Sequence, residues 1–198
     1  CQLGRTQPLH TERRVFFQNL EIMAQLRVAL DSHKPGEIDW VTFVGSGETT
    51  LHTGLGAMIR GVKTMTNLPV AAITNGSLLH LPEVREELAA ADAVLPSLDA
   101  GDSQLYRRIN RPHPSLTFER LTDGLIAFRE MYQGKLWVEV MLVRGLNDTE
   151  SALRKIAGWL VKIRPDEVHL VQPARPPAEG WVKPPDEAGL KRAKAILG

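Results

Sequence analysis

The residues with the clearest capacity for chemistry form one acidic, glycine-rich stretch, Gly45-Ser46-Gly47-Glu48-Thr49. The aromatic and β-branched run at 39–44 predicts a short buried strand before it. Apolar residues recur at helical spacing after it, at Leu55, Met58, Ile59 and Val62. The stretch is therefore predicted to be a turn at the C-terminal end of a strand, where parallel sheets and barrels bind ligands. Because Glu48 would repel a phosphate, the turn favours a cationic or amino-bearing ligand.

Three other kinds of turn could occupy these residues. A dinucleotide fold needs G-x-G-x-x-G and an acidic residue at the end of the next strand, but Thr50 and Asn75 stand at those places. A phosphate loop needs Gly-Lys-Ser or Gly-Lys-Thr, and neither follows the turn. The third alternative is an ordinary strand-to-helix turn with a solvated glutamate.

Alternating strand and helix patterns position this turn. Further strands are predicted at 70–74, 93–98, 136–142 and 167–171, and their apolar runs indicate cover on both faces. Helices are predicted at 19–32, 55–66, 82–88, 103–110, 118–132, 153–163 and 186–197. Asn19 is the expected N-cap of the first, followed by an apolar stripe that begins at Leu20. Strands alternating with helices predict an α/β fold of parallel strands, either an open doubly wound sheet or a partial barrel.

Parallel strands would bring the polar residues that follow them to one rim. These residues are Thr74, Asn75, Ser97, Asp99, Arg144, Asn147 and Gln172. Each alone is common in turns, but together on one rim they indicate a site for a polar ligand. The sequence has no G-x-S-x-G elbow and no Ser-His-Asp order, which argues against acyl transfer.

Length, charge and cysteine content limit the classes of protein to which this sequence can belong. The 198 residues suit one domain, and the net charge of +1 indicates neither a broad nucleic-acid surface nor a membrane surface. No apolar run approaches the roughly 20 residues of a membrane span, and no signal-peptide pattern is present. The single cysteine, Cys1, cannot form an internal disulfide, which fits a reducing compartment, and a cytoplasmic location is expected.

These motifs resemble those of the radical S-adenosylmethionine (radical SAM) superfamily. The turn resembles its Gly-x-Gly-Glu-Pro-Thr-Leu motif, with Thr49 in place of proline, and Cys1–Thr6 resembles the segment that begins at the third cysteine of C-x3-C-x2-C. Residues 73–76 and 97–99 resemble the exits of its third and fourth strands. Residues 111–113 and 176–182 resemble a group of iron–sulfur oxidoreductases related to wyosine-type tRNA-modifying synthases.

The resemblance implies a partial (β/α)6, TIM-like barrel over residues 1–198, with its first strand ahead of Cys1 and a further C-terminal domain as an additional possibility. It implies two cofactors, a [4Fe–4S] cluster and SAM. An electron from the cluster would cleave SAM to a 5′-deoxyadenosyl radical that abstracts hydrogen from a substrate, either a small molecule or a tRNA. The electron would come from a donor such as flavodoxin or ferredoxin.

The resemblance also implies roles for particular residues, none of them a catalytic side chain. Cys1 would ligate iron, and Gly45, Ser46, Gly47, Glu48 and Thr49 would form the turn that receives the methionyl ammonium group. Thr74, Ser97 and Asp99 stand where the family binds the carboxylate or ribose, with Asn75 and Asn147 as further candidates. Val171 and Gln172 stand where the adenine packs, and Arg111, Arg175 and Trp181 are candidates to reach over the mouth.

Two departures from the family pattern bear on function. Thr49 replaces a proline, and only one of the three cluster cysteines is present, so the chain alone is expected to be inactive and N-terminally truncated. A non-catalytic βα-fold binding or scaffold protein with a degenerate site is the alternative function. A nucleotide- or sugar-binding α/β enzyme is a third, against which Thr50 and Asn75 argue.

Overall fold

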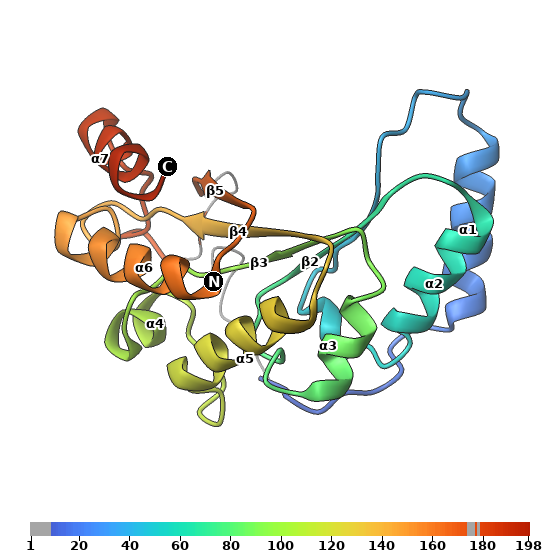
Figure 1. Cartoon of the computed structure of the whole chain (residues 1–198), viewed down its shortest axis with the longest axis horizontal. Coiled ribbons are helices and arrows are strands. Elements are labelled where there is room, and N and C mark those ends of the chain that lie inside the picture. The colour runs from blue at the N-terminus through green and yellow to red at the C-terminus, as the bar shows by residue number, and fades with distance from the viewer. Residues whose placement is uncertain (1–8, 174–176, 178) are drawn as a thin grey trace.

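A five-stranded parallel sheet organises the protein (Figure 1). The computed structural model describes residues 9–173, 177 and 179–198. The strands are β1 (Val41–Phe43), β2 (Val70–Thr74), β3 (Ala93–Pro96), β4 (Lys135–Met141) and β5 (Glu167–Val171). Each pairs in parallel with the next, and their order in the sheet is their order along the chain. The predicted α/β class is confirmed, and this sequential parallel order is consistent with a partial TIM-like barrel.

Helices cover one side of this sheet. They are α1 (Asn19–Asp31), α2 (Leu55–Met65), α3 (Pro82–Leu88), α4 (Ser103–Ile109), α5 (Phe118–Met131), α6 (Glu150–Ile163) and α7 (Glu187–Leu197), with a 3-10 helix η1 (Thr49–Leu51). Figure 1 shows α3, α5 and α6 along one side, with α1 and α2 at one end of the molecule and α7 at the other. No helix in the described ranges has the length and apolar character that crossing a membrane requires.

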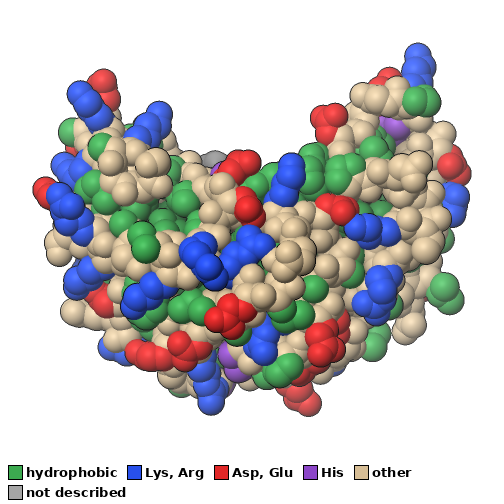
Figure 2. Space-filling model, viewed as in Figure 1, with side chains coloured by type: hydrophobic (Ala, Val, Ile, Leu, Met, Phe, Trp, Pro, Cys, Tyr) green, Lys and Arg blue, Asp and Glu red, His purple; other side chains and the backbone are tan. Residues whose placement is uncertain are grey.

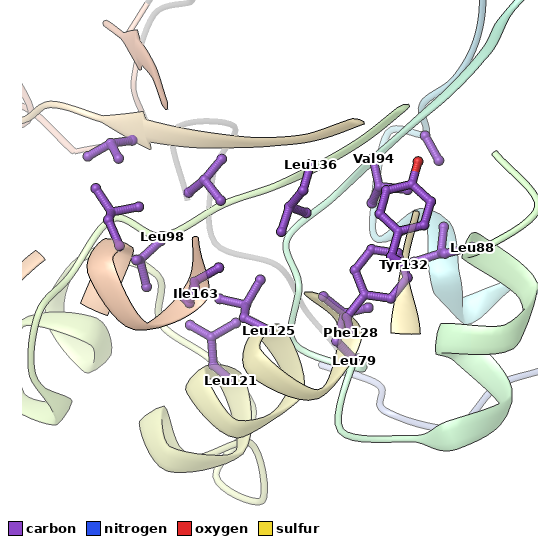
Figure 3. Close-up of a cluster of buried hydrophobic side chains, with 14 of the residues drawn as sticks. Leu79, Leu88, Val94, Leu98, Leu121, Leu125, Phe128, Tyr132, Leu136 and Ile163 are labelled. Carbon is purple, nitrogen blue, oxygen red and sulfur yellow. The ribbon is translucent and has the colours of Figure 1, made fainter. Parts of the chain in front are cut away.

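The hydrophobic core lies between the sheet and these helices. Leu121, Leu125 and Phe128 of α5 point toward Leu136 of β4 and Val94 of β3 (Figure 3). Tyr132 stacks on Phe128 with ring centroids 4.6 Å apart, and its hydroxyl donates to Ala91 O at 2.9 Å. Burying such large apolar side chains contributes about 1.5–3 kcal/mol each, so this layer fixes the helices against the sheet.

Strand β4 is sealed on one face only. Leu136, Val138 and Val140 are fully buried and face the helices, whereas Trp137 and Glu139 alternate with them and are half-buried. The prediction of cover on both faces is therefore wrong for β4 in the described part of the chain. The sequence misled because Trp137 supplies an apolar residue on the open face, which makes an alternating strand look continuous.

Helix α1 also differs from the prediction. Its N-cap is Gln18, and no side chain caps it. Asn19 instead reaches across to the loop before α2, where it contacts His52 Nε2 at 2.8 Å and donates to Gly54 O at 3.3 Å. Leu20, expected on the apolar stripe, is 85% exposed. The rest of the stripe is half-buried, and Met23 and Leu26 pack against the core, while α1 meets mainly α2 at this end of the molecule.

Two strands are shorter than predicted. Strand β1 covers Val41–Phe43 rather than 39–44, and β3 ends at Pro96 rather than at residue 98. After Pro96, Ser97 N donates to Thr74 O at 3.2 Å, Ser97 forms an isolated bridge with Glu139, and Leu98 N donates to Glu139 O at 2.9 Å. The bridge keeps the register of the Ala93–Lys135 pair, so the β3 exit continues beside β4 and brings residues 97–99 to the end of β4.

Close packing of α5 on the loop before α3 gives a first prediction. A Cβ on Gly124 would lie 2.6 Å from His80 N and 2.7 Å from Leu79 C. Gly124→Ala should therefore lower the free energy of unfolding by about 1–3 kcal/mol, because backbone has to move. Gly158→Ala in α6 is the matched control, since its Cβ would meet nothing within 4 Å. The control should gain about 0.5–1 kcal/mol from helix propensity. Equal stabilities in equilibrium urea unfolding would contradict the close contact.

Candidate functional site

The acidic turn is fastened to the end of β2 through the carboxylate of Glu48. Glu48 Oε1 accepts hydrogen bonds from Thr50 N at 3.0 Å, Thr50 Oγ1 at 2.6 Å and Thr74 Oγ1 at 2.5 Å. Oε2 accepts from Asn75 N at 2.7 Å. The structure thus brings Glu48, Thr74 and Asn75 together, as the rim prediction expected. Because Oε2 accepts one hydrogen bond from the described residues, it retains acceptor capacity for a ligand.

The same carboxylate explains a local element that the sequence pattern did not reveal. Glu48 is the N-cap of η1, and its side chain accepts from Thr50 N. Thr50 itself is 1% exposed, so the residue that breaks the dinucleotide pattern is buried against the turn. Side chains that cap a helix hold the entering backbone in one orientation. The turn is therefore rigid at Glu48, where a bound group would need a preorganised acceptor.

The glycines of the turn leave the backbone open beside that carboxylate. Gly45, Ser46 and Gly47 are exposed, and a Cβ on Gly47 would meet no atom within 4 Å. A ligand ammonium group needs hydrogen-bond acceptors, and the exposed turn offers carbonyl oxygens next to a carboxylate. The residues of this rim therefore fit a group with a positively charged amine.

Two predicted binding residues, Asp99 and Asn147, are buried beneath the rim. Asp99 is 6% exposed and accepts from Met141 N at 2.8 Å and Asn110 Nδ2 at 2.7 Å. Asn147 is fully buried, accepts from Val143 N at 2.6 Å, and donates to Asp99 O at 2.8 Å and Met141 O at 2.7 Å. These side chains join the exits of β3 and β4. The part played by Asn110 was not foreseen from the sequence, where it reads only as the end of a helix.

Burial raises the pKa of Asp99 to about 6, against the opposing effect of the hydrogen bonds from Met141 and Asn110. The unfolded carboxyl group titrates near pH 4, so the folded protein binds the additional proton between about pH 4 and pH 6. The stability that Asp99 confers is therefore greatest at low pH and is lost as the pH rises through about 6.

Asp99→Asn is expected to remove this pH-dependent loss. The asparagine keeps an oxygen for Met141 N. Once the Asn110 amide is turned, the new NH2 donates to Asn110 Oδ1, a buried atom without a partner among the described residues. Relative to the wild type, the variant should gain about 1–2 kcal/mol in free energy of unfolding as the pH rises from 5 to 8. Denaturant unfolding at both pH values measures this difference, and a pH-independent difference would contradict it.

The remaining predicted residues lie at the same end of the sheet. Ser97 follows β3 and is half-buried, Val171 ends β5 opposite Met141, and Gln172 is exposed just beyond it. Cys1 lies outside the described residues. Within those residues, no three His, Cys, Asp or Glu side chains are grouped to hold a metal ion. The rim thus supplies acceptors for an amine-bearing ligand, and the described ranges supply no ligand set for a cluster.

Residues from two distant segments meet beside this rim. Arg111 Nη1 donates to Glu179 Oε1 at 2.9 Å, and its guanidinium lies 5.7 Å from the centroid of the Trp181 ring. Together they line a small pocket with Met141 and Val143 at the end of β4. Arg111 and Trp181 therefore do come together, while Arg175 lies outside the described residues.

Comparison with known proteins gives one family. A sequence model described as the Radical SAM superfamily matches residues 1–156. Two solved structures share the fold at 20% identity: a domain of a pyruvate-formate lyase-activating enzyme from Bacteroides vulgatus and a radical SAM methyltransferase from Sphaerobacter thermophilus. The match to the first structure has a TM-score of 0.61 and covers 79% of this chain and 91% of the chain in that structure. The match to the second structure has a TM-score of 0.59 and covers 90% of this chain and 53% of the chain in that structure.

Curated relatives are longer than this chain. It is 38% identical over 98% of its length to a Brachyspira hyodysenteriae protein named GTPase Obg, of which it spans 28%. It is 35% identical over its whole length to a UPF0026 protein of Methanocaldococcus jannaschii, of which it spans 61%. The name GTPase applies to that relative, of which this chain spans only 28%. The present sequence contains no Gly-Lys-Ser or Gly-Lys-Thr that could form a GTP phosphate loop.

Proposed function

Because the chain belongs to the radical SAM superfamily, we propose that it binds SAM at the Glu48 turn and serves a reaction that begins with the reductive cleavage of SAM. The observation that carries this proposal is the Glu48 carboxylate, held rigidly beside exposed glycine backbone with acceptor capacity left on Oε2. A methionyl ammonium group is the part of SAM whose charge and donors match such a site.

The rest of the rim would hold the other parts of SAM. The turn Gly45–Thr49 would receive the amine, and the exposed Asn75 side chain and the Thr74 exit lie next to it. Ser97, a half-buried residue, is proposed to face the ribose, and Val171 and Gln172 the adenine. Asp99 and Asn147 would act through the backbone they fix, because their side chains are engaged beneath the surface.

Chemistry beyond binding would come from the cofactors. When bound, SAM and a [4Fe–4S] cluster would supply one-electron cleavage of the sulfonium and a 5′-deoxyadenosyl radical that abstracts a hydrogen atom from the substrate. Such clusters use cysteine thiolates, and this sequence contains one cysteine, Cys1. We infer that the remaining cluster thiolates come from outside these 198 residues and that the 198 residues alone are inactive.

The partners follow from the same premise. Cleavage consumes one electron, so a reductant such as flavodoxin or ferredoxin would supply it. A small-molecule substrate suits the net charge of +1 better than tRNA, which would require a larger basic surface. An oxidoreductase or synthase type remains the proposed class. A reducing compartment such as the cytoplasm would keep cluster thiolates free of disulfides.

Formation of 5′-deoxyadenosine tests the proposal. The protein is expressed anaerobically from its complete reading frame, its cluster is reconstituted, and SAM is added with dithionite as the electron source. We expect 5′-deoxyadenosine and methionine to form in a reaction that requires both iron and dithionite. A reconstituted protein that neither binds SAM nor cleaves it would favour the non-catalytic βα-fold scaffold.

A further inference from the structure

The face of the sheet opposite the helices is hollow. Figure 2 shows the hollow between the end of the molecule that carries α1 and α2 and the end that carries α7. Strand register decides which residues line it. Leu136, Val138 and Val140 face the helices, so Trp137 and Glu139 face the hollow. Because Glu139 pairs with His169, the imidazole lies on the same face, one strand further along.

Aromatic rings close the floor of this hollow. Trp40, just before β1, contacts Trp137 of β4 edge-on, with ring centroids 5.5 Å apart, although β2 and β3 lie between their strands. Such a contact requires the sheet to curl, as a barrel wall does. Ala71 and Ala93, on the intervening strands, are 4% and 0% exposed. Trp137 also lies 5.6 Å from the His169 ring, so the aromatic surface continues from β1 to β5.

The Glu139 carboxylate stands above that floor, and Glu167, which pairs with Trp137, lies on the same face. The Glu139 carboxylate is half-buried, and no hydrogen bond to it is found within the described ranges. Burial raises the pKa of Glu139, while the nearby His169 opposes this effect. His169 Nε2 itself contacts Glu167 Oε2 at 2.9 Å. Burying part of a carboxylate without a hydrogen-bond donor costs free energy. A ligand with a positive charge would offset that cost.

The indole surface beside Glu139 is suited to the same kind of group. Lys135 Nζ lies 5.4 Å from the centroid of the Trp137 ring, so a cation already contacts this indole. The Trp137 Nε1–H is buried without an acceptor among the described side chains and backbone. An aromatic face attracts cations through its quadrupole, and an adjacent carboxylate adds charge complementarity. The Glu139 carboxylate and the Trp137 ring thus face the hollow together.

From these contacts we propose that the hollow is the substrate pocket and that Glu139 selects a substrate with a cationic nitrogen group, such as an amine, amidine or guanidine, held against Trp137. This rests on the proposed function, because the SAM rim lies directly above. Met141, at the rim, follows Glu139 by two residues on the same face, a rise of about 7 Å. That spacing would hold a small substrate between the carboxylate and the reactive end of SAM.

Benzamidine and its neutral near-isostere benzamide test the charge preference in the reconstituted protein without SAM. Calorimetric titration should show benzamidine binding at least about tenfold tighter than benzamide, and Glu139→Gln should abolish that preference. Glu150→Gln, which removes an exposed carboxylate on α6, is the matched control and should keep it. Thermal unfolding of each variant checks that the fold is retained. If Glu139→Gln does not fold, Trp137→Leu, which removes the aromatic face, should lose the preference in its place.

Failure of this proposal is separable from failure of the proposed function, because SAM binding is titrated in the same samples. Equal binding of the two probes, no saturable binding of either, or a preference that survives Glu139→Gln would overturn the cationic pocket. SAM binding retained alongside any of these results would overturn the pocket alone. Loss of SAM binding in the wild type would overturn the proposed function.

Discussion

Glu48→Gln should weaken SAM binding by about 10- to 100-fold, the largest change in ligand affinity that the structure predicts. Glutamine removes the negative charge opposite the ammonium group. It can keep the oxygen that accepts from Thr50 and Thr74, but its NH2 then faces Asn75 N–H, where Oε2 accepts at 2.7 Å in the wild type. Two donors would meet there, so we also expect a loss of about 1–3 kcal/mol in stability.

A second variant separates lost charge from lost rigidity. Thr50→Val removes the hydroxyl that donates to Glu48 Oε1 at 2.6 Å and leaves the carboxylate charged. It should cost about 1 kcal/mol of stability and change SAM affinity by less than about threefold. Equilibrium titration of SAM into both anaerobic, cluster-loaded variants measures the difference. Equal affinities in Glu48→Gln and the wild type would mean that the turn does not receive the ammonium group.

Asn147→Ala should produce the largest loss of stability, about 3–5 kcal/mol, with a midpoint of thermal unfolding lower by roughly 10 °C. The side chain is fully buried and makes hydrogen bonds to Val143 N, Asp99 O and Met141 O. Alanine would leave each of these backbone groups without that partner. The exits of β3 and β4 would separate, and the SAM rim would lose its support on that side.

Asn147→Asp separates the contribution of the two hydrogen bonds that the Asn147 amide donates from that of the one it accepts. An aspartate can still accept from Val143 N, but it cannot donate to the carbonyl oxygens of Asp99 and Met141. We expect a loss similar to that of alanine at pH 8. Asn67→Ala, at an exposed position, is the control and should change stability by less than about 0.5 kcal/mol. Unfolding by urea compares the three, and an Asn147→Ala variant as stable as the control would contradict the buried junction.

Most strands and helices could be predicted from local sequence patterns. Strands 70–74 and 167–171 are found at the predicted residues, and Pro82 begins α3 as its missing N–H suggested. Leu20 of α1 shows where a pattern fails, since an apolar stripe predicts burial only where another surface covers it. Leu20 is 85% exposed because the described residues place no such surface there.

The site was harder to read than the fold because its decisive contacts join distant residues. The charge of Glu48 suggested an amine-binding turn, but its bond to Thr74 spans 26 residues and depends on β1 pairing with β2. The sequence predicts Asp99 on the rim, whereas its hydrogen bond from Met141 N spans 42 residues and draws its side chain under the surface. Glu139 reads as a single charge in an apolar strand, and only the pairing of β4 with β5 sets it beside His169.

Electron paramagnetic resonance of the reduced protein, with and without SAM, tests most directly whether this turn serves a radical SAM centre. The protein is purified anaerobically from its complete reading frame and reconstituted with iron and sulfide. We predict the signal of a reduced [4Fe–4S] cluster that shifts when SAM is added, with a shift in Thr50→Val but none at the same SAM concentration in Glu48→Gln. A cluster signal that ignores SAM in the wild type, or no cluster at all, would contradict the proposed function.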